Sequence, residues 1–304
     1  MTNMLKRTVV ALFLIVAGHT GPAFAKQPPA PAMAQPAPLL RPALWKVTDA
    51  DTTIYLFGTI HLLPQGMNWL EGPLAAALAT ADELVTEIPE LDDHAVQSSL
   101  MARAVLPTGK SLRALLSEGD RVKFEATLAG FGLPVDSFDS YKPWYAAVVL
   151  ATVPLLREGF ALGSGVENTL SERIKLRGKP RLGLETLDYQ LALFDGLPQE
   201  TQLRYLAEVI GALPTLRRDV DEIVGEWGEG DSTRLAELMN AEEDDPVMVA
   251  ALLTNRNRIW AGWIKTRLET PGTSFVAVGA GHLGGAGSVQ DQLLQLGIAS
   301  ARVQ

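Results

Sequence analysis

The stretch FVAVGAGH, residues 275–282, decides the fold. Its unbroken apolar run predicts a buried strand over residues 274–278, and the glycines that follow let the chain turn sharply before His282. The same order occurs near the other end of the chain, where TIYLFGTIH, residues 53–61, runs from an apolar strand through Gly58 to His61. Because the carboxyl ends of strands in open α/β sheets hold ligands and catalytic groups, two Gly-x-x-His motifs at strand exits predict one shared site.

The neighbouring segments extend this sheet. Residues 44–47 are expected to pair with residues 53–57 as a hairpin that turns at 49–51, and ELVTEI, residues 83–88, reads as a strand that stops at Pro89. Helices are predicted over residues 74–82, 252–268 and 289–296. The fold class is α/β, or α+β in some schemes, with a small sheet formed by the N- and C-terminal parts of the chain.

A long insertion separates the two histidine motifs. It is mostly helical from about residue 93 to 270, with amphipathic runs at 111–116, 120–129 and 202–210. Its most apolar run, residues 146–156, is interrupted by Pro154 and is far shorter than the roughly 20 residues of a membrane span. We therefore expect a buried core helix there.

The N-terminus has the order of a secretory signal. Lys6 and Arg7 precede an apolar run, residues 8–18, and the small-x-small triplet AFA at 23–25 predicts cleavage after Ala25. An uncleaved anchor is the alternative. Residues 26–42, rich in proline and alanine, predict a disordered tether, and residues 43–304 are expected to form a single domain. The protein is thus predicted to be exported to the periplasm, without a transmembrane segment after cleavage.

Composition excludes several classes of function. The net charge is −9, and removal of Lys6 and Arg7 with the signal would bring it to about −11, so nucleic acid and anionic membranes are not expected partners. The chain has no cysteine, which excludes disulfides, thiol nucleophiles and cysteine-bound metals. Any metal would have to use His, Asp and Glu. The oligomeric state is not predicted.

Histidine is scarce, which narrows the search for a site. Of four histidines, His19 lies in the predicted signal, and His94 lies beside two aspartates on an acidic segment that is expected to be exposed. A single Gly-x-x-His occurs often by chance, and either remaining histidine alone is explained as a core or capping residue. Two copies in matching contexts favour a site that uses both His61 and His282.

Two carboxylates and one arginine complete the candidates. Glu87 ends the 83–88 strand, so it is expected at the same sheet edge as His61, and Glu185 follows the short strand-like element LGLET, residues 182–186. Each could instead cap a helix or form a salt bridge. Arg256 lies on the predicted helix 252–268, where basic residues are usually solvated, and it becomes a candidate only through the resemblance described next.

The chain resembles the TraB/GumN family, which is related to the Tiki-type metalloproteases. The matching pieces, in order, are FGTIHLLP (57–64), LVTEIP (84–89), YKPW (141–144), GLET (183–186) followed by Gln190 and GLP (196–198), RNRIW (256–260) and FVAVGAGHLGGAGSV (275–289). The resemblance assigns the site to His61, Glu87, Arg256 and His282. The chain departs from the family pattern at residues 165–167, where it has Gly-Val-Glu in place of an expected Gly-x-Asp.

This resemblance implies a metal-dependent hydrolase, a protease or peptidase that acts on a peptide or protein outside the cytoplasm. Two imidazoles with Glu87 and Glu185 suit Zn²⁺ or Mn²⁺, and such a metal makes hydroxide available at neutral pH. Arg256 would stabilise an oxyanion or hold a substrate carboxylate, and Glu87 would bind the metal or act as the base. The chain lacks His-Glu-x-x-His, so it is not a zincin.

Three alternatives stay open at this point. The same pocket could bind a small ligand or haem without turnover, although no haem attachment motif is present. It could capture a peptide as an inhibitory binding protein. Hydrolysis could also proceed without a metal, through a His/Glu pair.

Overall fold

The computed structural model describes residues 39–160, 164–240 and 246–304. The predicted signal peptide and most of the predicted tether lie outside these residues. The last four tether residues, 39–42, lie against the fold: the backbone N–H of Leu40 donates to the Asn68 carbonyl at 2.8 Å, and that of Arg41 to the Gly228 carbonyl at 2.7 Å. In the described part of the chain, no helix combines the length and the apolar character needed to cross a bilayer.

The sheet is mixed and has six strands in the order β4-β3-β5-β2-β1-β6. The strands are β1 (Leu44–Thr48), β2 (Thr52–Thr59), β3 (Glu83–Thr86), β4 (Arg181–Gly183), β5 (Gly272–Gly279) and β6 (Ala301–Arg302). The predicted hairpin is confirmed as the antiparallel pair β1–β2. Strands β2, β5, β3 and β4 run parallel to one another as neighbours. The sheet is therefore built from both ends of the chain, with only β4 supplied by the insertion.

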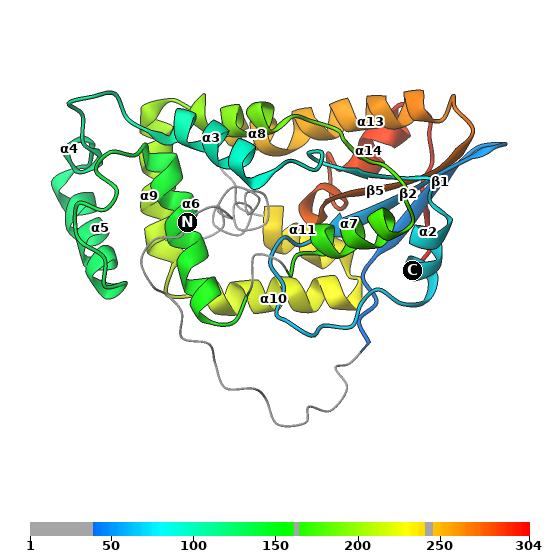
Figure 1. Ribbon diagram of the computed structural model, residues 1–304, viewed down its shortest axis with the longest axis horizontal. Coiled ribbons are helices and arrows are strands. Elements are labelled where there is room, and N and C mark those ends of the chain that lie inside the picture. Colours follow the sequence, from blue (N-terminus) through cyan, green and yellow to red (C-terminus); the bar gives the residue numbers. More distant parts are fainter. Residues whose placement is uncertain (1–38, 161–163, 241–245) are drawn as a thin grey trace.

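Side chains of the central strands alternate between two cores. In β5, Phe275 and Ala277 face one core and Val276 and Val278 face the other. The second core includes α13 (Asn255–Arg267) and α14 (Val289–Gln295), while α2 (Gly72–Thr80), α7 (Val166–Leu176) and α10 (Leu216–Glu229) pack in the first. Figure 1 shows these helices on opposite sides of the sheet. Burial on both faces explains why β5 reads as a continuous apolar run.

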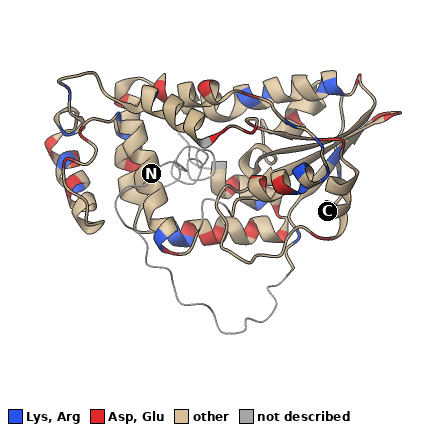
Figure 2. Ribbon diagram, in the orientation of Figure 1, with Lys and Arg blue, Asp and Glu red and all other residues tan. Residues whose placement is uncertain are grey.

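The insertion is helical, as predicted, and the α/β class with a helical insertion is confirmed. Figure 2 shows charged residues of both signs along its outer helices, for example on α10. Its remaining helices are α3 (Asp93–Ala104), α4 (Leu112–Leu115), α5 (Glu118–Gly130), α6 (Pro143–Arg157), α8 (Leu187–Asp195), α9 (Gln199–Ala212), α11 (Ser232–Asn240) and α12 (Pro246–Val249).

Two local predictions need correction. Pro154 does not interrupt the apolar helix, because it lies in the last turn of α6 and the helix continues to Arg157. The predicted helix 252–268 does not begin as an α-helix: residues Ala250–Thr254 form a π-helical segment that leads into α13. Such wider turns inside helices occur often at functional sites. This one ends two residues before Arg256.

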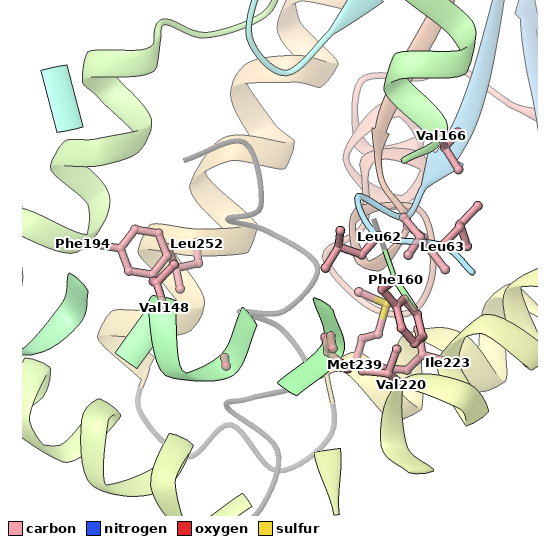
Figure 3. Close-up of a cluster of buried hydrophobic side chains, with 14 of the residues drawn as sticks. Leu62, Leu63, Val148, Phe160, Val166, Phe194, Val220, Ile223, Met239 and Leu252 are labelled. Carbon is pink, nitrogen blue, oxygen red and sulfur yellow. The ribbon is translucent and has the colours of Figure 1, made fainter. Parts of the chain in front are cut away.

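The loop after β2 is anchored by its apolar side chains. Leu62 and Leu63 are buried, and Figure 3 shows them beside Phe160 and the α10 residues Val220 and Ile223. The α10 side chain of Trp227 also donates to the Gly58 carbonyl at 2.8 Å. These contacts hold the backbone on both sides of His61.

Candidate functional site

Four of the five predicted site residues follow the carboxyl ends of four adjacent strands, and the fifth, Arg256, lies on α13. Thr59 of β2 pairs with Gly279 of β5, so the two Gly-x-x-His segments leave the sheet side by side. Glu87 directly follows β3. Glu185 follows β4 by two residues, and its backbone N–H donates to the Glu87 carbonyl at 2.8 Å.

The glycines of the two motifs have different tasks. A Cβ atom on Gly58 would lie 3.0 Å from both Cα and Cβ of Ala280, so glycine lets the two strand exits touch. Gly279 instead uses its backbone N–H, which donates to Glu87 Oε1 at 2.8 Å. The two motifs therefore touch each other at the sheet edge, and the second one also binds the Glu87 carboxylate.

Arg256 lies at the centre of the site and is 2 % exposed. Its Nε donates to Glu185 Oε1 at 2.8 Å, and Nη2 donates to Glu87 Oε2 at 2.6 Å and Glu185 Oε2 at 2.9 Å. Its Nη1 donates to the Leu252 carbonyl and to His282 Nε2, both at 3.2 Å. A guanidinium has five N–H groups, and these contacts use all five. Arg256 therefore has no donor left for a substrate oxyanion or carboxylate in this arrangement.

Both carboxylates are also engaged. Gln190 Nε2 bridges Glu87 Oε2 at 2.8 Å and Glu185 Oε2 at 3.0 Å, and Trp260 Nε1 donates to Glu185 Oε1 at 3.0 Å. Burial raises the pKa of Glu87, but the charge of Arg256, with smaller contributions from the two histidines and the N–H of Gly279, outweighs it and lowers this pKa to about 2. A carboxylate so stabilised is a weak base, so the geometry disfavours Glu87 as the general base.

His282 belongs to the same network. Its Nδ1 lies 2.5 Å from Asn257 Oδ1, and its ring centroid lies 4.5 Å from that of Trp260. The Arg256 guanidinium carbon lies 4.7 Å from the same Trp260 ring. Trp260 thus supports both the imidazole and the cation, within the distance at which a ring face attracts a cation.

His61 forms a separate pair with Glu167. Its Nδ1 lies 2.6 Å from Glu167 Oε1, and the two residues are 6 % and 5 % exposed. Its Nε2 is buried and has no hydrogen-bond partner among the described residues. Burial lowers the pKa of His61, but the charge and hydrogen bond of Glu167, with a contribution from Glu87, outweigh it and raise the net value above the ordinary 6.5. His61 is the predicted site residue with an unused functional nitrogen.

Close backbone contact places Glu167 against His61. Val166 N–H donates to the Ile60 carbonyl at 3.1 Å, and Gly165 lies so near that a Cβ atom on it would be 2.3 Å from the His61 carbonyl oxygen. The residue before Glu167 on α7 is thereby tied to the residue before His61. Glu167, the residue at which the chain departs from the Gly-x-Asp pattern of the family, is therefore the partner of His61.

We expect Gly165→Ala to destabilise the protein by about 1–3 kcal/mol, as overpacking against rigid backbone does. The methyl group cannot fit without moving α7 away from His61, so the His61–Glu167 pair should also separate. Urea unfolding measures the first effect. The matched control is Gly211→Ala on α9, where nothing lies within 4 Å and where alanine should stabilise the helix by up to about 1 kcal/mol. Equal stability of the two variants would contradict the close contact.

Acid should weaken the Glu87 network. The pKa of Glu87 is depressed from 4.5 to about 2, so its contribution to stability is present above pH 4.5 and is lost as the pH falls towards 2. The contribution is on the order of 3 kcal/mol. The pH dependence of the unfolding free energy should therefore flatten in Glu87→Gln. Glu90→Gln, at an exposed carboxylate that pairs with Lys175, should keep the wild-type slope.

The residues do not fit the metal site that the resemblance implies. Among the described residues, no group of three or more His, Asp or Glu side chains is placed to hold a metal ion. Arg256 Nη2 takes up Glu87 and Glu185, and Nη1 faces the ring nitrogen of His282. The guanidinium thus lies where the predicted ligands converge. The divalent metal stays a prediction.

Four site residues were missed in the sequence: Glu167, Gln190, Asn257 and Trp260. Signals for them existed. Glu167 stands where the chain departs from the family pattern. Gln190 follows GLET at the family spacing, and Asn257 and Trp260 belong to the matching piece RNRIW. Trp260 is also one turn after Arg256, the spacing at which helix side chains meet. His94, in contrast, is exposed as predicted.

Comparison with known proteins places the chain in a family. The model of the TraB/PrgY/gumN family matches residues 43–302, and the chain belongs to that family. Two similar proteins are the uncharacterized protein YbaP of Escherichia coli (strain K12), 25% identical over 256 residues, and YbaP of Shigella flexneri, 26% identical over 256 residues. Each alignment covers 83% of this chain and 92% of the relative. No solved structure matches the chain.

Proposed function

We propose that this protein is a hydrolase of peptide bonds or related acyl bonds, in which His61 transfers protons and Glu167 orients it. The observation that carries the proposal is the buried, unpartnered Nε2 of His61, opposite an Nδ1 that Glu167 holds. A carboxylate on one imidazole nitrogen fixes the ring and stabilises the imidazolium that forms when the other nitrogen accepts a proton.

The proposed step uses water as the nucleophile. The neutral Nε2 of His61 takes one proton from water while the water oxygen attacks the carbonyl carbon, which gives a tetrahedral intermediate. The imidazolium then returns this proton to the leaving group as the bond to that group breaks. Glu167 stays ionised throughout. Arg256 and Glu87 act on His61 only through their charges, since their polar groups are already bonded to each other.

The resemblance supports a more specific form, a metal-dependent protease. Its support is the family relation and the presence of two histidines and two carboxylates at one sheet edge. The proposed proton transfer by His61 and Glu167 does not depend on a metal. Ligand capture without turnover is the other candidate, because an unpartnered buried nitrogen also suits a hydrogen bond to a bound ligand.

A turnover screen separates these possibilities. The purified mature protein is incubated with a library of fluorogenic peptides and acyl esters, with EDTA, or with added Zn²⁺ or Mn²⁺. Cleavage that persists in EDTA supports the His61–Glu167 reaction. Cleavage that appears only with added metal would support the metalloprotease form, and saturable binding without cleavage would support the binding protein.

We also propose that the protein is exported to the periplasm and loses residues 1–25. The support is the charged, apolar and small-residue order of the N-terminus. Intact mass of protein recovered from the periplasm should correspond to a chain that begins at Lys26. Recovery of the full chain from the cytoplasm would overturn the proposal.

A further inference from the structure

The two Gly-x-x-His histidines differ in what surrounds them. His61 has one carboxylate partner and a free nitrogen, whereas both ring nitrogens of His282 face polar side chains of α13. The neighbours of His282 on that helix, Arg256 and Asn257, determine the proton positions on its ring. Asn257 is fully buried.

The amide of Asn257 can point only one way. Its Nδ2 lies 2.7 Å from the carbonyl oxygen of Gly287, which can only accept a hydrogen bond. The atom placed there must therefore be the NH₂ group. The opposite orientation would bring two oxygen acceptors together in a buried place, which costs the energy of an unmade hydrogen bond. Oδ1 of Asn257 consequently faces His282.

His282 then has one allowed state. Because Asn257 Oδ1 only accepts, Nδ1 of His282, 2.5 Å away, must carry a hydrogen. At the opposite side of the ring, Arg256 Nη1 only donates, so Nε2 of His282 must present its lone pair across 3.2 Å. Two independent partners thus require the same neutral tautomer. An imidazolium would set an N–H group against the guanidinium.

We infer that Asn257 is a positioning residue that holds His282 as the neutral Nδ1–H tautomer. His282 is then a fixed acceptor for Arg256, and it is not a second proton-transfer histidine. The charged groups near its ring are Arg256 and, across the network, Glu87 and Glu185; the Trp260 ring lies against it. The tautomer rests on these contacts alone, while the contrast with His61 rests on the proposed function.

The tautomer is directly observable. In protein labelled with ¹⁵N-histidine, long-range ¹H–¹⁵N spectra should show a pyrrole-type Nδ1 and a pyridine-type Nε2 for His282. This pattern should be present at neutral pH. The chain has four histidines, so single replacements of the others assign the signals. An Nε2–H tautomer or an imidazolium at neutral pH would overturn the inference.

Asn257→Asp tests the positioning residue. The carboxylate still accepts from Nδ1, but it loses the bond to Gly287 and adds a negative charge beside the ring. The His282 signals should therefore shift to the imidazolium pattern. Asn255→Asp makes the same chemical change on the same helix, at a side chain that accepts a hydrogen bond from the exposed Arg258, and should leave the His282 signals unchanged.

The outcomes separate the two proposals. An unchanged His282 spectrum in Asn257→Asp would overturn the positioning role, whatever the activity. If Asn257→Asp does not fold, the wild-type spectrum alone decides, because it reports the tautomer without any variant. A protein that has the Nδ1–H tautomer but cleaves nothing would overturn the proposed hydrolysis and leave this inference standing.

Discussion

Replacing His61 by alanine is expected to lower kcat/KM by about 10²–10⁴-fold, the contribution typical of a positioned general base. The other histidine of the repeated motif cannot substitute, since both its ring nitrogens already face Asn257 and Arg256. The measurement is initial rate on a substrate from the turnover screen, with circular dichroism to show that the variant is folded. His94→Ala, at an exposed histidine on α3, is the control and should keep wild-type activity. Full activity in His61→Ala would end the proposed mechanism.

The pH profile of the same reaction gives an independent check. The imidazole of His61 must be neutral to accept a proton. Because Glu167 raises the pKa of His61, the acidic limb of the kcat/KM profile should lie above pH 6.5. Glu167→Gln removes the negative charge, which leaves burial to lower the pKa of His61. Its acidic limb should therefore move to lower pH, while its maximal rate falls because the imidazolium loses its stabilising partner. A limb that stays in place would show that Glu167 does not act on the titrating group.

Patterns that follow from one strand or one helix could be predicted from the sequence. The apolar runs that end in Gly58 and Gly279 form adjacent parallel strands. They could be predicted because buried parallel strands are continuous apolar segments in the sequence. The position of Glu87 at the sheet edge followed from the same pattern. The two-residue β6 could not be predicted, since its pairing with β1 depends on a contact between the two ends of the chain.

The connections between side chains were beyond the sequence. Repetition of Gly-x-x-His suggested equivalent histidines, but the partners come from elsewhere: Glu167 from α7 for His61, and Asn257 from α13 for His282. Arg256 looked like a solvated helix residue because basic residues on helices usually are, and its neighbour Arg258 is indeed exposed, whereas Asn257 is buried. The burial of Arg256 depends on the π-helical segment before it and on two carboxylates that lie far away in the sequence.

Removal of that buried cation should give the largest stability change in the molecule. We expect Arg256→Met to lower the unfolding free energy by about 3–5 kcal/mol, the cost of breaking a buried ion pair by removing one partner. Methionine fills similar space, so the lower unfolding free energy reflects the missing charge more than lost packing. Glu87 and Glu185 would face each other without compensation, and their buried charges could be relieved only by proton uptake.

This origin of the penalty makes its pH dependence predictable. Since protonation removes the uncompensated charge, the deficit of Arg256→Met relative to wild type should shrink as the pH falls from about 7 towards 4.5, where carboxyl groups begin to bind protons. Adding Glu87→Gln and Glu185→Gln to Arg256→Met should restore part of the lost stability at neutral pH, because an uncharged cluster needs no cation. This triple variant also keeps the test usable if the single variant does not fold. Urea unfolding at several pH values measures all three proteins.

Arg258→Met is the matched control for this substitution. Arg258 is exposed on the same helix and donates to Asn255 at 3.0 Å, so its replacement should change the unfolding free energy by no more than about 0.5 kcal/mol. If Arg256→Met proved as stable as Arg258→Met, the two glutamates could not both be ionised beside a buried guanidinium. The cluster would then be a neutral hydrogen-bonded network. The low pKa of Glu87 would be wrong, and so would the predicted loss of stability in acid.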